Sequence, residues 1–154
     1  VDISSDGSIV AIGTPYNDGN GSNAGHVRIY QNKSGLWTQI GSDIDGEAAD
    51  DRTGSSVSLS SDGSIVAIGA TGNDGNGTDA GHVRIYQNKS GLWTQIGSDI
   101  DGEAAGDASG LSVSLSSDGS IVAIGNKQDG QANLFFVDSH VKTDYLSSAD
   151  HTVS

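Results

Sequence analysis

The stretch SSDGSIVAIG, residues 60–69, decides the fold because it occurs three times, beginning at Ser4, Ser60 and Ser116. The spacing is 56 residues both times, and 45 of the 56 positions are identical between the first two copies. A repeat of this length indicates an array of similar structural units. The expected units are residues 1–56, residues 57–112 and a shortened, divergent third copy at residues 113–154.

Each full copy predicts four short strands. In the second copy, residues 56–60 alternate serine with apolar side chains, and the tight-turn dipeptide Asp62-Gly63 follows. Residues 65–69 are apolar at consecutive positions, so this strand must be covered on both faces. Residues 82–87 alternate again, and residues 92–100 are the fourth predicted strand. Glycine interrupts every window that could form a helix, so we expect an all-β fold.

Four antiparallel strands in sequence order, a meander, predict that each copy is one blade of a β-propeller. A solenoid of stacked sheets is the alternative, but hairpin turns favour the antiparallel meander. Two glycine-containing pairs carry a resemblance: Gly110-Leu111 precedes a first strand, and Gly69-Ala70 closes a second strand. Gly54-Ser55 and Gly13-Thr14-Pro15 occupy the same positions one copy earlier.

With the HVRIY strand that begins at His82, these pairs resemble the FG-GAP repeat of integrin-α-type propellers. The Ser-Asp-Gly turn and the HVRIY strand are also similar to WD-repeat blades. The FG-GAP resemblance implies an adhesion or binding module outside the cell. Many FG-GAP blades carry an Asp-x-Asp-x-Asp-Gly calcium loop before the second strand, but here Ser58 and Ser60 replace its first two acids. Calcium is therefore not expected at that loop.

Composition excludes several classes of function. The chain has 20 acidic and 7 basic side chains and a formal net charge of −13, which argues against a nucleic-acid partner. No window of 18 apolar residues is present, so membrane insertion is not expected. The absence of cysteine removes disulfides and thiolate zinc sites.

The first two copies differ at eleven positions, and these are not spread evenly. Asp2/Ser58 and Ile3/Leu59 lie in the first strand. The other nine fall in the loops after the second and fourth strands: Thr14/Ala70, Pro15/Thr71, Tyr16/Gly72, Ser22/Thr78, Asn23/Asp79, Asp50/Gly106, Arg52/Ala108, Thr53/Ser109 and Ser55/Leu111. In a propeller both loops emerge on one face, so this acidic loop face is the expected working surface. Drift of long loops, while tight turns stay fixed, is the alternative.

Candidate site residues come from these loops. The predicted ligand-binding set is Tyr16, Asp18, Asn23, Asp50, Arg52, Asp74, Asp79 and Asp107. The acidic runs that begin at Asp43 and Asp99 offer oxygen ligands for calcium, the one cofactor considered. The predicted calcium set is Asp43, Asp45, Glu47, Asp51, Asp99, Asp101, Glu103 and Asp107. Because neither run has EF-hand spacing, solvated acidic loops are the alternative.

Catalysis is not expected. Asp43 and Asp45 could suggest paired carboxylates of a glycosidase, but the pair recurs in each copy whereas an active site is normally single. His26 and His82 are expected to be hydrogen-bonded strand residues. Trp37 and Trp93 are expected to pack between blades, with stacking on a sugar as the alternative.

The third copy diverges after Gly125. Its loop is expected to be about five residues shorter, with NLFFVD (residues 133–138) replacing the HVRIYQ strand. Phe135 and Phe136 are expected to face a neighbour. The tail, residues 140–154, would supply the last strand or remain loose.

Three blades do not close a propeller, since closure takes at least four. We expect either a homodimer that closes a six-bladed ring or additional blades in a longer chain. The expected function is a non-catalytic, secreted or cell-surface module that binds a glycan or a protein through the acidic loop face. The alternative is a structural spacer with no ligand of its own.

Overall fold

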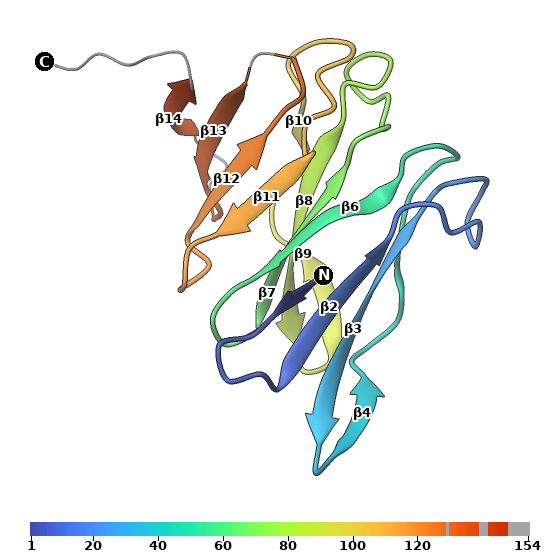
Figure 1. Cartoon of the computed structure of the whole chain (residues 1–154), viewed down its shortest axis with the longest axis vertical. Helices are drawn as coiled ribbons and strands as arrows, with labels where there is room; N and C mark the ends of the chain where they lie inside the picture. The colour runs from blue at the N-terminus through green and yellow to red at the C-terminus, as the bar shows by residue number, and fades with distance from the viewer. Residues whose placement is uncertain (129, 139–141, 148–154) are drawn as a thin grey trace, which may run out of the picture.

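The computed structural model describes residues 1–128, 130–138 and 142–147. Over these residues the chain is all-β and contains no helix. Its strands form three antiparallel sheets, which follow one another in chain order from blue through green to red in Figure 1. The prediction of an all-β fold built from antiparallel meanders is confirmed.

The first sheet contains five strands. Four of them pair in chain order. The fifth, β5, pairs with His26 and Val27 at the start of β3, on the edge whose other end pairs with β4. The strands are β1 (Asp2–Ile3), β2 (Ile9–Thr14), β3 (His26–Lys33), β4 (Leu36–Gln39) and β5 (Ile44–Asp45).

The second sheet repeats this arrangement. Its strands are β6 (Thr53–Leu59), β7 (Ile65–Ala70), β8 (His82–Lys89), β9 (Leu92–Gln95) and β10 (Ile100–Asp101). The expected boundary between residues 56 and 57 therefore lies inside β6. The prediction of one unbroken strand over residues 92–100 is wrong, because β9 and β10 pair with opposite ends of β8.

The break in this edge strand has a local cause. Gly97 has φ of +69°, which is incompatible with an extended strand, and Gly41 has φ of +68° at the same place in the first sheet. Between the two short strands, the Asp99 carboxylate accepts a hydrogen bond from the Arg84 guanidinium of β8 at 2.7 Å.

The third sheet contains β11 (Ser112–Leu115), β12 (Ile121–Gly125), β13 (Gln131–Phe136) and β14 (Lys142–Ser147). Its register corrects the expected alignment. Gly69 pairs with Val83, whereas Gly125 pairs with Ala132, so the third loop is seven residues shorter rather than five. The strand that replaces HVRIYQ is consequently QANLFF. The tail does supply the last strand through residue 147, and its residues 148–154 lie outside the described residues.

The three sheets are stacked through two apolar layers. Between the first and second sheets, Val27 and Ile29 pack with Val66 and Ile68. Between the second and third sheets, the core residues are Ala67, Val83, Ile85, Ile100, Val122, Ile124 and Val137. Strand β7 thus contributes alternate side chains to both layers, which confirms that this strand is covered on both faces.

The phenylalanines of the third copy have different environments. Phe135 packs against the second apolar layer, as expected for a residue that faces a neighbour. Phe136 is 45% exposed, so the same expectation is wrong for this side chain in the isolated chain.

Neighbouring sheets approach each other closely at glycines. A Cβ atom placed on Gly13 would meet the carbonyl oxygen of Gly54, and one on Gly69 would meet the carbonyl oxygen of Gly110. Gly54 and Gly110 have φ of +89°, a conformation that L side chains rarely adopt. These four glycines are the residues that carried the FG-GAP resemblance, and their shared role is to let adjacent sheets touch through backbone.

Candidate functional site

The two long loops of each copy pack together at one end of the sheets. In the first copy, the backbone amides of Arg52 and Thr53 donate to the carbonyls of Asn23 and Ala24 at 3.0 and 2.9 Å. The Asn20 side chain also donates to the Gly46 carbonyl at 2.7 Å. Figure 1 shows these loops on the upper side of the molecule, away from the short turn between β3 and β4. The loops thus form one continuous face.

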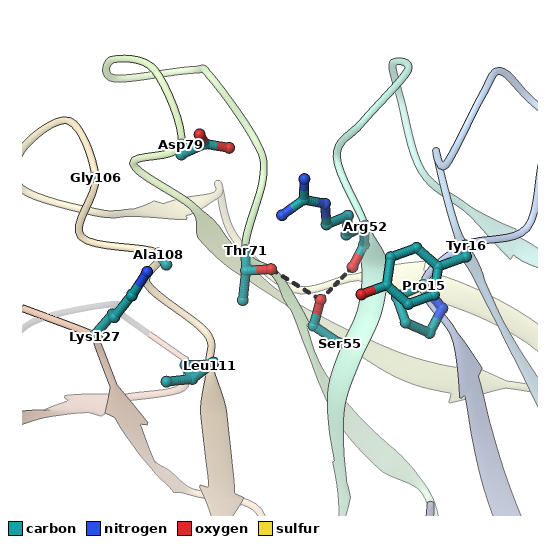
Figure 2. A pocket seen from close by; sticks show the side chains of 10 residues that line it. All are labelled: Pro15, Tyr16, Arg52, Ser55, Thr71, Asp79, Gly106, Ala108, Leu111 and Lys127. Atoms are coloured by element: carbon teal, nitrogen blue, oxygen red, sulfur yellow. Dashed lines mark hydrogen bonds between the residues drawn. The ribbon is translucent and has the colours of Figure 1, made fainter.

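A groove of about 530 Å³ crosses this face over the ends of all three sheets. A volume of this size is in the range of small-molecule sites. Figure 2 shows the groove from close by, with side chains converging from the loop ends of separate sheets. Its lining residues are Pro15, Tyr16, Arg52, Ser55, Thr71, Asp79, Gly106, Ala108, Leu111 and Lys127.

All the lining residues share one property: they stand at positions where the copies differ. Nine of them belong to the eleven divergent positions of the first two copies. The tenth, Lys127, occupies in the third copy the place of Pro15 and Thr71. Identical loop residues such as Asn17 and Ala48 are not part of the lining. Six of the nine divergent loop positions therefore contribute to this one surface, whereas Thr14/Ala70, Ser22/Thr78 and Thr53/Ser109 do not.

The backbone of the groove is the same in both copies although the side chains differ. Arg52 and Ala108 both have positive φ, +58° and +48°. The amides of Ser55 and Leu111 donate to the carbonyls of these two residues, each at 3.1 Å. Since one turn accepts either arginine or alanine, the side chain at this position is free to change without altering the fold.

Hydroxyl groups fix the first half of the groove. Ser55 Oγ donates to the Arg52 carbonyl at 2.6 Å and lies 3.0 Å from Thr71 Oγ1, as the dashed lines in Figure 2 show. In the next copy Leu111 and Lys127 stand at these two positions. Each half of the groove therefore has its own chemistry: hydroxylic and aromatic near Tyr16, apolar and cationic near Leu111.

Of the eight residues predicted to bind ligand, Tyr16, Arg52 and Asp79 line the groove and the other five do not. Those five are Asp18, Asn23, Asp50, Asp74 and Asp107. Most of them hold loop conformation instead. The carboxylates of Asp18 and Asp74 each accept a backbone amide five residues later, at 2.8 Å.

The groove residues missed by the sequence analysis are Pro15, Ser55, Thr71, Gly106, Ala108, Leu111 and Lys127. Six of these were already among the divergent positions. Selecting charged side chains from that set lost them, whereas divergence by itself would have found them.

The carboxylates predicted to bind calcium are mostly engaged within the protein. Asp43 accepts both Nε and Nη2 of Arg28 at 2.8 Å, and Asp99 does the same with Arg84 at 2.7 and 2.8 Å. The hydrogen bond from Arg28 lowers the pKa of Asp43 to about 2, and the hydrogen bond from Arg84 lowers that of Asp99 to about 2.

The remaining acids of that set are dispersed. Asp51 is buried and accepts the Ala48 amide at 3.0 Å, and Asp107 is buried and accepts the Ala104 amide at 2.9 Å. Glu47 pairs with Arg84 across the sheets. In the second copy, Glu103 pairs with Lys142 at 3.1 Å. These contacts hold the loops and join the sheets.

Two groups could hold a metal ion, and each includes a histidine that the sequence analysis set aside. His26 lies with Asp43 and Asp45, and the second group is His82, Asp99 and Asp101. Burial and then the nearby Arg84 cation lower the pKa of His82, which favours the neutral imidazole. A metal would have to compete with arginine for Asp43 or Asp99. Calcium binding remains a prediction.

The tryptophans have different surroundings. Trp93 packs against the first apolar layer and its Nε1 donates to the Ile40 carbonyl of the first sheet at 3.0 Å, so it lies between sheets as expected. Trp37, the same residue one copy earlier, is 46% exposed.

The comparisons with known proteins bear on the fold alone. No protein-family model and no curated protein matches the sequence. The structure is similar to the hydrazine synthase of Kuenenia stuttgartiensis, with a TM-score of 0.58 and 14% sequence identity. The match covers 97% of this chain and 35% of that chain, so this chain spans about a third of the neighbour's length. No helix in the part of the chain that the structure describes is long and apolar enough to span a bilayer.

Proposed function

We propose that the chain is a non-catalytic binding module, secreted or displayed at a cell surface, whose three sheets are propeller blades and whose ligand is a glycan or a protein. The single observation that supports binding is the groove: every side chain that lines it stands where the copies differ. Loops tolerate substitution on a constant scaffold, so divergence concentrated in the groove can change specificity while the fold is kept.

The proposed binding surface is a part of the acidic loop face and not the whole of it. The acidic loops hold most of their carboxylates in internal hydrogen bonds, whereas the groove side chains of Tyr16 and Arg52 are exposed. The groove is therefore the proposed binding surface within the acidic loop face. The location outside the cell rests on the FG-GAP resemblance and on the Gly-, Ser-, Asn- and Asp-rich composition.

The outer side of the first sheet exposes apolar side chains that a partner would cover. On the first sheet, Ile12 and Trp37 are 37% and 46% exposed, while their counterparts Ile68 and Trp93 are covered by the preceding sheet. We propose that a second copy of the chain covers this side and closes a six-bladed ring, with further blades of a longer chain as the alternative.

The repeat supplies variants for testing the binding function. Tyr16→Gly, Arg52→Ala and Ser55→Leu each install the residue that the second copy carries at that place, so the fold is known to accept it. We expect the wild-type chain to be retained on an array of neutral and acidic glycans or on immobilised extracellular proteins, and the triple variant to lose that retention.

A matched control uses divergent positions outside the groove. Ile3→Leu with Ser22→Thr makes the same kind of exchange between copies without touching the lining. Retention that survives in this control and is lost in the groove variant supports the proposal. No retention of the wild-type chain on either array would favour the structural spacer.

A further inference from the structure

We propose that the groove recognises a sugar acid, that is, a carboxylate-bearing residue of a polysaccharide. This inference rests on the proposed binding function and adds the chemical class of the ligand. It is carried by two cations without ion partners that face the same groove, together with the neighbouring groups that a sugar ring would contact.

Most basic side chains whose surroundings the structure describes have an assigned place. Arg28 and Arg84 bind Asp43 and Asp99, and Lys142 binds Glu103. Lys33 and Lys89 lie at the β3–β4 and β8–β9 turns, at the far end of the sheets.

The two remaining cations, Arg52 and Lys127, both line the groove. Neither forms an ion pair with any residue in the described part of the chain. In a chain with 20 acidic side chains, two unpaired cations that face one groove are available for an external anion. A guanidinium binds a carboxylate through two parallel hydrogen bonds.

The other groove residues match the rest of a sugar. Tyr16 is 71% exposed and Leu111 is 52% exposed, so both offer apolar surface to the C–H face of a pyranose ring. Asp79 lies across the groove with no side-chain hydrogen bond of its own in the described residues, and a carboxylate accepts sugar hydroxyl protons.

Asp79 also separates sugar acids from other anions. An acidic peptide would use the cations but would bring its own carboxylates against Asp79. A densely sulfated polymer would meet, beyond the groove, the field of a chain with a net charge of −13. A sugar acid carries one carboxylate among several hydroxyls, which satisfies both the cations and Asp79.

The test compares oligosaccharides that differ only in the carboxyl group. Oligogalacturonate, alginate and hyaluronan fragments, each beside its carboxyl-reduced form, are titrated against the full chain by calorimetry. We expect at least one acidic member to bind and its reduced form to bind at least tenfold more weakly. Binding is expected to weaken as salt rises, since the cations are exposed.

Variants locate the binding to the groove. Arg52→Ala and Lys127→Thr introduce the residues found at the same positions of the second copy, Ala108 and Thr71, and each is expected to weaken binding about tenfold. Lys33→Gln and Lys89→Gln remove the same charge at the far turns and are expected to stay within about twofold of the wild type. Thermal unfolding of each variant checks that the fold is retained.

Different failures have different meanings. If the reduced sugars bind as well as the acids, or if the groove variants bind like the wild type, the sugar-acid inference is overturned while the binding function stands. The same holds if no acidic oligosaccharide binds but a neutral glycan, a polyglutamate peptide or a protein does. If nothing is retained on any array, both proposals fail.

Discussion

At the residue scale, stacking of the sheets depends on glycines whose role is purely steric. Gly69 has no unusual backbone conformation, yet a Cβ atom there would overlap the Gly110 carbonyl of the next sheet. Gly91, in the β8–β9 turn, shows the opposite case: its φ is +86° but the space around it is open. Gly69 is therefore required because two sheets approach closely there, whereas Gly91 is required only for its positive φ.

These two glycines give the first prediction. Gly69→Ala is expected to reduce the free energy of unfolding by about 3 kcal/mol, because backbone on both sides must move apart. Gly91→Ala is expected to cost only about 1 kcal/mol, the cost of a positive φ. Urea denaturation of both variants measures the difference. Equal losses would mean that the sheets are free to separate at Gly69.

Protonation of the ion-paired aspartates gives the second prediction. Hydrogen bonding from Arg84 lowers the pKa of Asp99 to about 2, from the ordinary aspartate value of 3.8. A lowered carboxyl pKa stabilises the fold above pH 4, and this stabilisation is lost as the pH falls through about 2. For the partly exposed Asp99 we expect about 1 kcal/mol after solvent screening.

The measurement is the free energy of unfolding between pH 7 and pH 2. Asp99→Asn is expected to lower stability at pH 7 and to flatten the profile between pH 4 and pH 2. Asp79→Asn, which installs the residue that the first copy carries at this position, serves as the control because the Asp79 carboxylate has no ion pair among the described residues. A wild-type profile that is already flat below pH 4 would contradict the expectation.

At the scale of elements, the sequence predicted the strands well wherever they are buried. The apolar run of β7 indicated a strand covered on two faces because no polar side was left for solvent. The break between β9 and β10 was not predicted, because the sequence alone does not show that Gly97 takes a φ of +69° or that Asp99 reaches Arg84, fifteen residues earlier. The register of β13 was missed for a similar reason, because strand pairing and not sequence likeness sets it.

The candidate site residues were likewise predicted in part from the sequence. Divergence between copies identified the groove positions, but charge misdirected the choice among them, because an aspartate such as Asp18 is as useful to loop geometry as to a ligand. The groove itself arises from three sheets, so which of the divergent positions line it could be decided only after the sheets were placed.

The tryptophans give a prediction for whole elements. Trp93→Ala in β9 is expected to cost about 2–3 kcal/mol, since the indole packs between sheets and donates to the Ile40 carbonyl. Trp37→Ala in β4 is expected to cost less than about 1 kcal/mol in the isolated chain, because that indole is 46% exposed and no other sheet of the described residues packs over it. Chemical denaturation of dilute protein compares the two. Similar losses would indicate that Trp37 is covered in solution.

At the scale of the whole molecule, corresponding apolar residues are covered in the second sheet and exposed in the first. In the second sheet Leu59 and Ile68 are 7% and 1% exposed, whereas their counterparts Ile3 and Ile12 are 56% and 37% exposed. A shallow apolar pocket of about 340 Å³ lies on this side of the first sheet, lined by Val10, Ile12, Tyr30 and Trp37. These four residues are identical in the second copy, where the preceding sheet covers them. Exposed apolar surface of this kind favours association.

The last prediction concerns that association. Light scattering after size exclusion is expected to give about twice 15.6 kDa if two copies close a ring. Ile12→Asp places a charge on the open side and is expected to yield the monomer with its fold retained, since Ile12 is already partly exposed. Leu36→Asp is the control: its counterpart Leu92 stays 66% exposed even in the covered sheet, so this change leaves the mass unaltered. If the wild-type chain is a monomer, the dimeric ring is excluded and further blades of a longer chain are left to cover the open side. If all three proteins have the same dimer mass, the contact between copies lies elsewhere. The groove crosses all three sheets of one chain, so a ring would bring two such grooves to the same face, and one polysaccharide could then be held at two points.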